Sequence, residues 1–313
     1  MTHTSTLPRP RRETGAPAQD GPVMLATKPF TGLDTPLAVA RWLAAWEGRE
    51  LHAVSVLEEE DGIATPIDAP TLPRRIHDEA RTALAAVIRR ELVGDDGEPD
   101  GLQVDVLDGP SARTVVDAAR ACNARIIVVG SGRHARIGRI IYGERALDIV
   151  ALADRPVLVV PGQAVAVSPS VAVVAIDFSP ASLRAAHAVL PMLAPGARLI
   201  VVHVKTGATP KEEDAGWWND VYERRCADRF AQFLRQLPRQ SGVTFESKFL
   251  RGDVVSSVLD FAATQGAELI ACGRLSHSLV ERVFVGSVSS ALVRHAPCPV
   301  LVAPERPGDA AWP

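Results

Sequence analysis

The sequence predicts an α/β protein made of two tandem copies of one doubly wound, mostly parallel, five-stranded domain. One observation is an internal repeat, in which RPVLVVP at residues 155–161 returns as CPVLVAP at residues 298–304. At this spacing of 143 residues, 13 of the 38 positions from 124 to 161 are identical without a gap. A second observation is that short β-branched runs alternate with helical patterns, which favours parallel strands joined by helical crossovers.

Each copy is expected to contain five buried strands, because five short apolar runs occur in it in the same order. The expected strands are residues 23–27, 50–56, 103–108, 125–129 and 156–160 in the first copy, and residues 170–176, 197–204, 243–250, 268–272 and 299–303 in the second. In the second copy Ser179 and Pro180 stand in N-cap and N1 order, which predicts the start of a helix. A long amphipathic helix is expected from about residue 212 to residue 237.

The repeat divides the chain into two domains, residues 22–162 and residues 170–305, joined by a linker of residues 163–169. Residues 1–21 are rich in Pro, Thr, Arg and Gly, so we expect a disordered tail there. This segment also lacks the apolar core of a secretory signal. Residues 306–313 are expected to form a second tail.

The composition excludes several classes of protein. A formal net charge of −3 gives no electrostatic footprint for nucleic acid, and no apolar run approaches the roughly 18 residues of a membrane span. The four cysteines, at positions 122, 226, 272 and 298, form no C-x-x-C pair. We therefore expect a reduced, cytoplasmic protein that binds neither nucleic acid nor membrane.

A candidate anion site lies in the second copy. Gly273 and Gly286 bracket twelve residues that follow an expected strand and precede an expected helix. Gly273 is expected to let the chain turn off the strand and to leave room for a ribose or phosphate. Behind Gly286, free N–H groups and the positive end of the helix dipole favour an anion, and the hydroxyl of Ser287 adds a donor. Asp177 ends the first strand, which meets the fourth at the switch point, and its carboxylate can accept bonds from a base amino group or a ribose hydroxyl.

Each feature alone also has a structural interpretation. Gly-Ser before a helix is an ordinary N-cap, and Asp177 can cap the helix that begins near Ser179. Their combination at two strand ends that meet favours the phosphate site. A P-loop and a G-x-G-x-x-G segment after either first strand are missing from the sequence, which argues against a dinucleotide dehydrogenase. The eight His lack metal-ligand spacing, and the Ser-His-Ser of residues 276–278 is no triad, because neighbours in sequence do not form one.

These residues resemble the universal stress protein family over both copies. The likeness is carried by the Asp that ends the first strand, by a segment close to G-x-x-G, nine residues and G-[ST], and by the final P-V-L-V-V strand. It implies a tandem Rossmann-like fold of the adenine nucleotide α-hydrolase-like type. Val204 then matches a position against adenine, Gly252 matches a turn beside the pocket, and Ser276 replaces the second glycine. The nucleotide-binding residues implied by the resemblance are Asp177, Val204, Gly252, Gly273, Ser276, Gly286, Ser287 and Val288.

The first copy departs further from the family pattern. Thr27 stands in place of the Asp, Arg133 in place of the second glycine, and Glu144 in place of the Ser after Gly143. A carboxylate roughly 4 Å from a phosphate charge costs about 4 kcal/mol at an effective dielectric near 20, which is about three powers of ten in affinity. We expect Glu144 to occupy the phosphate position, paired with Arg133 or Arg136, so that the first copy is a structural or dimerising partner.

The resemblance implies a stress-response regulator or sensor that binds ATP, with or without Mg²⁺, in the second copy and has little or no turnover. The sequence leaves ATP, AMP and a cyclic nucleotide open as ligands, and the partner protein unidentified. The alternative is a non-nucleotide-binding dimerisation or interaction module of the same family. An enzyme, such as a nucleotide hydrolase or transferase, is favoured least because no strong general base stands beside the phosphate site in sequence.

A homodimer through the last strand of a domain is also expected. The two last strands are apolar and lack charges that would guard an exposed edge. They can pair with each other within one chain or between chains.

Overall fold

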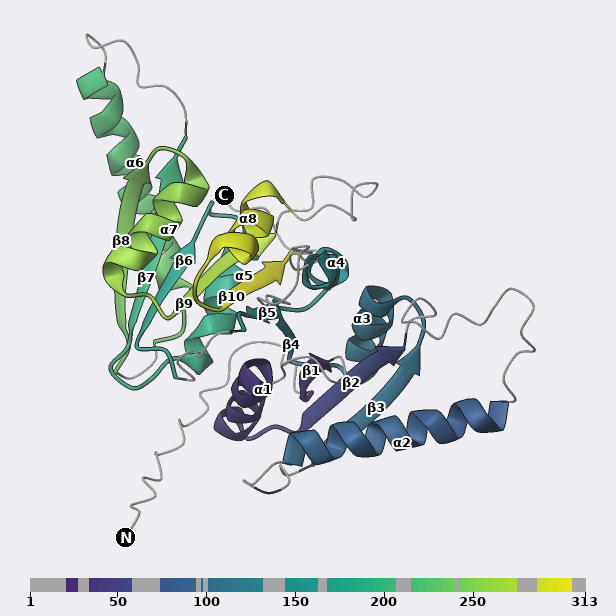
Figure 1. Cartoon of the computed structure of the whole chain (residues 1–313). Helices are drawn as coiled ribbons and strands as arrows, with labels where there is room; N and C mark the ends of the chain where they lie inside the picture. The colour runs from purple at the N-terminus through teal and green to yellow at the C-terminus, as the bar shows by residue number, and fades with distance from the viewer. Residues whose placement is uncertain are drawn as a thin grey trace.

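Figure 1 shows the computed structural model of the chain. It describes residues 21–27, 34–57, 74–93, 97, 101–131, 144–162, 168–206, 215–239, 242–274 and 286–305. The expected tails, apart from Gly21, and residues 163–167 of the expected linker lie outside the described residues.

Strands and helices alternate along both halves, as the sequence predicts. The first half contains β1 (Val23–Thr27), α1 (Asp34–Glu47), β2 (Leu51–Leu57), α2 (Arg74–Val93), β3 (Gln103–Asp108), α3 (Ser111–Ala121), β4 (Ile126–Gly130), α4 (Glu144–Leu152) and β5 (Val157–Val160). The second half contains β6 (Val171–Ala175), α5 (Pro180–Val189), the 3₁₀ helix η1 (Leu190–Met192), β7 (Arg198–Lys205), α6 (Ala215–Arg235), β8 (Thr244–Arg251), α7 (Val254–Gln265), β9 (Leu269–Arg274), α8 (Ser287–His295) and β10 (Val300–Pro304).

The ten strands form one continuous sheet, in the order β3-β2-β1-β4-β5-β10-β9-β6-β7-β8. Within each half all strand pairs are parallel, which confirms the doubly wound α/β class. The two halves meet where β5 and β10 pair in antiparallel fashion, with Val157 opposite Val302 and Val159 opposite Val300. The two expected five-stranded sheets are thus joined into one, whose centre lies at β5 and β10 (Figure 1).

This junction corrects the expectation of a homodimer through a last strand. β5 has β4 on one side and β10 on the other, and β10 has β5 and β9. Both hydrogen-bonding edges of each last strand are therefore occupied within one chain, so neither strand offers a free edge to a second copy. The two apolar last strands, β5 and β10, thus pair with each other within the chain.

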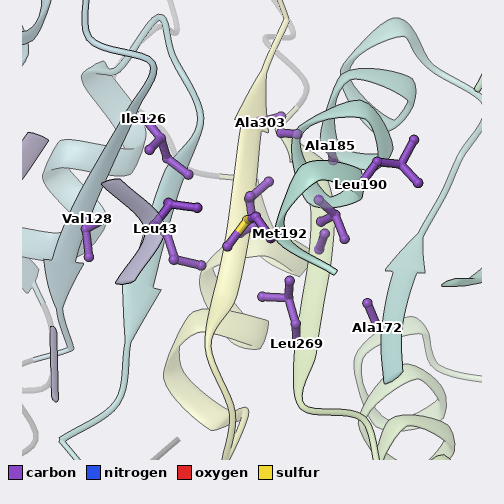
Figure 2. Packing of buried hydrophobic residues seen from close by; sticks show 14 of the residues in the cluster. Leu43, Ile126, Val128, Ala172, Ala185, Leu190, Met192, Leu269 and Ala303 are labelled. Atoms are coloured by element: carbon purple, nitrogen blue, oxygen red, sulfur yellow. The ribbon is translucent and has the colours of Figure 1, made fainter. Parts of the chain in front are cut away.

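Each face of the sheet is covered by helices from both halves. The face that we call the α5 face packs against α1, α2, α5 and α6, and the face that we call the α8 face packs against α3, α4, α7 and α8. One cluster of buried apolar side chains follows each face across the junction. Figure 2 shows part of the α5-face cluster, with Leu43 and Ile126 from the first half and Met192 and Leu269 from the second. The halves therefore share a continuous core.

Candidate functional site

Two of the predicted site residues, Asp177 and Gly273, lie at the carboxyl ends of β6 and β9. These two strands are neighbours, and Ala175 on β6 lies opposite Cys272 on β9. From β6 the chain continues into α5 on one face, whereas α8, the helix after β9, covers the other face. The ends of β6 and β9 therefore form the switch point of the second half, where open α/β sheets bind ligands.

Asp177 lies two residues beyond β6 and is exposed. Its Oδ1 accepts a 3.0 Å hydrogen bond from the amide of Ser179, and Oδ2 has no partner among the described residues. Burial raises the pKa of the Cys272 thiol to about 12, and the negative charge of Asp177 adds to this shift. The charge of Asp177 thus reaches Cys272 on the neighbouring strand β9, while only Oδ1 is engaged by a described residue.

Asp177 does not cap α5, which was the alternative interpretation of this residue. The N-cap is Ser179, whose Oγ accepts a 3.2 Å bond from the amide of Ser182, and Pro180 occupies N1 as the sequence predicts.

Phe178, between Asp177 and the helix cap, has an unusual backbone conformation that the sequence did not indicate. Its φ is 62°, which places a non-glycine residue in the left-handed region. Its side chain is 2% exposed and packs against His203, Phe230 and Phe233 on the α5 face. This contact fixes the turn at which the chain leaves the strand, and with it the start of α5 and the position of Asp177.

Gly273 serves a different purpose from the predicted one. Strand β9 continues through it to Arg274, so the chain does not turn there. A Cβ at this position would lie 2.6 Å from the amide nitrogen of Ser182 and 2.8 Å from the carbonyl carbon of Ala181. Gly273 is therefore required because the first turn of α5 packs directly on the strand, and the predicted reason, room for a ribose or phosphate, is not needed to explain it.

The N-terminus of α8 has the predicted geometry of an anion site. Gly286 is the N-cap residue, and no described side chain caps this end of the helix. The hydroxyls of Ser289 and Ser290 each donate a 3.0 Å bond to the carbonyl oxygen of Gly286, so they leave the first amides open. Ser287 is exposed at the first helical position. The first amides of a nine-residue helix thus face an approach that no Cβ at the cap obstructs.

Val204 and Val288 line the same side of the sheet as this helix end. Val204 on β7 is 9% exposed and belongs to the α8-face cluster, as does Cys272, while Val288 packs against that cluster. Strand alternation also turns Asp177 to the α8 face, because Val173 and Ala175 lie there. The structure therefore brings Asp177, Val204 and the start of α8 to one face, whereas Gly273 on β9 faces α5.

Gly252 lies farther from the switch point, at the end of β8. Its φ is +125°, and its amide donates a 3.2 Å bond to the carbonyl oxygen of Lys205 at the end of β7. The left-handed turn explains the glycine, since side chains rarely adopt this conformation. Ser276 lies outside the described residues.

The sheet register corrects the comparison between the halves at one position. Val23 pairs with Ile126 in the first half, and Ala172 pairs with Leu269 in the second. Ile126 and Leu269 are equivalent positions of the repeat, so Val23 corresponds to Ala172. Thr27 then corresponds to Ile176, and the residue at the Asp177 position is Lys28, which lies outside the described residues.

Glu144 occupies the expected place in the first half. It is the first residue of α4, is exposed, and corresponds to Ser287 as the first residue of α8. Arg133, Arg136 and Gly143 lie outside the described residues, so the expected pairing of Glu144 with an arginine stays a prediction.

Other features do not belong to this site. A hollow of about 500 Å³, lined by Leu234, Leu237, Val243 and Phe245 among others, lies at the start of β8, at the opposite end of the strand from the switch point. The described residues contain no group of three or more His, Cys, Asp or Glu side chains that could hold a metal ion. Within the same residues, no helix is both long and apolar enough to cross a membrane.

Comparisons with known proteins agree with this fold. The sequence profile of the universal stress protein family matches residues 22–161 and again residues 171–304. A universal stress protein of Mycolicibacterium smegmatis is 28% identical over 214 residues, which cover 66% of this chain and 70% of that protein.

Two solved structures share the architecture of the whole chain. A universal stress protein from Archaeoglobus fulgidus, 17% identical, superposes with a TM-score of 0.58 over 90% of this chain and 98% of its own. A functionally unknown protein from Pseudomonas aeruginosa, 15% identical, reaches a TM-score of 0.60 over 91% of this chain and 93% of its own. With two profile matches that together span most of its length, the chain belongs to the universal stress protein family and is a tandem, two-domain member of it.

Proposed function

We propose that the chain binds an adenine nucleotide, ATP, at the switch point of its second half, and acts as a stress-response regulator or sensor with little or no turnover. The observation that carries this proposal is the uncapped N-terminus of α8 on the same face of the sheet as the carboxylate of Asp177. The two groups suit opposite ends of a nucleotide.

The helix end is suited to the phosphates. Free amides at the first turn of α8 and the positive end of its dipole attract an anion, and Ser287 adds a hydroxyl. A Cβ at Gly286 would lie 3.5 Å from Ser289 Oγ, which is an ordinary contact, and the φ of −52° suits any residue. Packing therefore does not require a glycine here, and close approach of a ligand explains Gly286 better than it explains Gly273.

Asp177 is suited to the nucleoside. A carboxylate repels phosphate but accepts hydrogen bonds from ribose hydroxyls or a base amino group. Its Oδ2 has no partner among the described residues, while Oδ1 is held by the amide of Ser179. Val204, on the same face, offers an apolar surface for the base.

The first half is proposed to bind no nucleotide. Glu144 begins α4 where Ser287 begins α8, so a phosphate at that helix end would approach a carboxylate. The cost of about 4 kcal/mol for like charges at roughly 4 Å exceeds the roughly 0.3–1 kcal/mol that a helix end contributes to binding an anion. We therefore expect one nucleotide per chain.

Little turnover is proposed because the described strand ends offer no evident general base for the phosphates. His203 is a residue of β7, and its side chain lies on the α5 face. There its Nδ1 lies 2.9 Å from the carbonyl oxygen of Ile176, and its ring packs on Phe178. Asp177 is engaged at the proposed nucleoside end. His203 thus lies on the face opposite the proposed ligand, and Asp177 is assigned to the nucleoside, so neither is proposed as a base for hydrolysis.

Titration calorimetry with ATP, AMP and cyclic AMP tests the proposal and identifies the nucleotide. ATP is expected to bind the wild-type chain, and Asp177→Ala and Gly286→Glu are each expected to abolish binding. Survival of ATP affinity in both variants would show that the assigned pocket is wrong.

The second candidate is an interaction module of the same family that binds no nucleotide. It is supported by Ser276 in place of a glycine and by the packing role of Gly273, which needs no ligand to explain it. This candidate predicts no heat with any of the three nucleotides and no adenine nucleotide in a heat extract of the purified protein.

A further inference from the structure

The continuous sheet ends in two edge strands, β3 in the first half and β8 in the second (Figure 1). An edge strand presents backbone N–H and C=O groups that no neighbouring strand pairs, and proteins usually protect such groups. Leu102, directly before β3, corresponds in the repeat to Phe245 on β8, which lies 143 residues later. The protection of the two edges can therefore be compared residue by residue.

The first half protects its edge with two arginines of α2. Arg81 donates a 3.2 Å bond from Nε to the carbonyl oxygen of Val106, and Arg89 donates a 3.1 Å bond to the carbonyl oxygen of Leu102. The amide of Gly109 bonds to β2, so the odd-numbered residues of this strand face β2 and the even-numbered ones face outward. Both outward carbonyls are thus occupied by guanidinium groups.

The second half leaves the equivalent edge open. The amide of Thr244 bonds to the carbonyl oxygen of Ala197, so the even-numbered residues of β8 face β7, and the backbone groups of Phe245 and Ser247 face outward. Within the described part of the chain, no group bonds to these outward N–H and C=O groups. Gln232 stands in the repeat position of the second arginine of α2, and it makes no bond to this edge.

A hollow of about 500 Å³ lies beside this open stretch, on the α5 face. The described residues that line it come from α6, from the segment that follows α6 and from the start of β8, and none comes from β7. Its apolar wall consists of Leu234, Leu237, Val243 and Phe245. The hollow therefore lies on the outer side of β8, where a side chain of an added strand can enter it.

The rim of the hollow is basic. Arg235 and Arg239 line it, both are exposed, and neither forms an ion pair with a described acid. Lys248 is exposed farther along β8, whereas Glu246, the only acid of this strand, is held by Arg198 at 2.7 Å. This surface attracts an acidic partner. It disfavours a second copy of the same edge, because pairing of two copies brings like charges together.

We propose that the outer edge of β8 is a docking site for an extended, acidic segment of another protein, which adds to the sheet as a further strand. The backbone of this segment bonds to Phe245 and Ser247, an apolar side chain enters the hollow, and acidic side chains pair with Arg235 and Arg239. Backbone pairing gives such a segment affinity, and the side-chain pockets give it specificity. The hollow lies at the opposite end of β8 from the switch point, so this inference does not rest on the proposed nucleotide site.

Fluorescence anisotropy of the full chain with a labelled peptide, ETETVTETE, tests the proposal. One face of this peptide strand carries a valine between glutamates, and the pattern reads the same in both chain directions. We expect binding, and we expect the peptide KTKTVTKTK to bind about ten-fold more weakly or not at all. Equal binding of the two peptides would overturn the acidic partner.

Variants of α6 locate the charges that the peptide contacts. Arg235→Glu is expected to weaken binding of ETETVTETE by about five-fold or more, because it removes a cation from the rim of the hollow. Arg225→Glu makes the same change at another exposed position of α6 and is expected to leave binding within about two-fold. Equal losses in the two variants would overturn the assignment of the rim.

The backbone pairing is tested at Ser247. Ser247→Pro removes an outward amide at an edge position and is expected to abolish peptide binding, whereas Ser247→Thr keeps the amide and is expected to bind as the wild type does. Peptides N-methylated at alternate residues repeat this test without changing the protein. A strand presents only alternate amides to its neighbour, so one alternate set should abolish binding and the other should not. Retained binding of both methylated peptides would overturn strand addition.

Sedimentation of the chain alone, and peptide binding to a nucleotide-site variant, complete the test. Ser247→Pro is expected to sediment as the wild type does, and a wild-type dimer that this variant dissociates would assign the edge to a second copy and overturn the acidic partner. Gly286→Glu is expected to bind ETETVTETE as the wild type does, whether or not ATP binds to the chain. Loss of peptide binding in Gly286→Glu would contradict a site at the far end of β8.

Discussion

The rings of Phe178 and His203 lie 4.8 Å apart between their centroids, on the α5 face directly beneath the turn that carries Asp177. Phe178 makes this contact with a φ of 62°. A side chain in that conformation costs about 1–2 kcal/mol, so packing against His203, Phe230 and Phe233 must exceed the strain.

Substitution of Phe178 separates the strain from the packing. Both Phe178→Ala and Phe178→Gly remove the buried ring, at a cost of about 3–5 kcal/mol. The glycine variant should nevertheless be about 1 kcal/mol more stable than the alanine variant, because glycine adopts positive φ without strain. Urea unfolding measures the difference. A more stable alanine variant would contradict the backbone conformation assigned to Phe178.

A methyl group should destabilise the chain more at Gly273 than at Gly286. Gly273→Ala places a Cβ within 2.6 Å of the Ser182 amide nitrogen, and we expect it to cost about 1–3 kcal/mol of the free energy of unfolding. Gly286→Ala meets only Ser289 Oγ at 3.5 Å and should cost less than about 1 kcal/mol. Urea unfolding of both variants checks this order, and equal losses would argue against the packing role of Gly273.

The first half has Glu144 where the second half has Ser287, so placing a glutamate at position 287 tests the argument that a carboxylate at this helix end repels phosphate. Ser287→Glu should lower ATP affinity by about three powers of ten, because it places a carboxylate at the helix end proposed to hold phosphate. The folded state should not lose stability, because an acid in the first turn of a helix gains about 0.3–1 kcal/mol. Thr244→Glu, on the exposed edge strand β8, adds the same charge elsewhere and should leave affinity within about two-fold. A similar loss of ATP affinity in both variants would mean that the net charge of the chain, and not the position of the carboxylate, lowers the affinity.

The lowered pKa of Asp253 predicts that this residue contributes to the loss of stability at acid pH. Its pKa is lowered from 3.8 by the hydrogen bond from the Ser256 amide at the N-cap of α7, with a further contribution from the Ser256 hydroxyl. A carboxylate with a depressed folded-state pKa contributes stability that is present above the unfolded pKa and is lost as pH falls through the folded one. Asp253→Asn should therefore lose stability less steeply than the wild type below about pH 4. If urea titrations show that the stability of Asp253→Asn and of the wild type falls equally steeply below about pH 4, Asp253 does not contribute to the acid sensitivity of the fold.

The fold could be predicted from the sequence because its signals are local and repeated. β-branched runs mark the strands, Ser179 and Pro180 mark a helix start, and the repeat makes each half confirm the other. The antiparallel pairing of Val157 with Val302 was open, since apolar edges pair equally well within a chain or between chains.

The site was predicted less completely, for spatial reasons. Arg274 and Ala153 are 121 residues apart, and no local pattern indicates their contact. Thr27 was assigned one position out of register, because the repeat holds without a gap only from Ala124 onward, and strand pairing was needed to align β1 with β6. Gly273 was correctly chosen as a constrained glycine, but its constraint comes from α5, which the sequence does not place against it.

Titration calorimetry of the full chain with ATP tests the central claim most directly, when the stoichiometry is combined with the protection of amides from hydrogen exchange at the starts of α4 and α8. We predict one ATP site per chain, protection by ATP of residues 286–290, and no ATP binding to the Gly286→Glu variant. Two sites per chain, or one site that survives Gly286→Glu and protects residues 144–148, would contradict this claim.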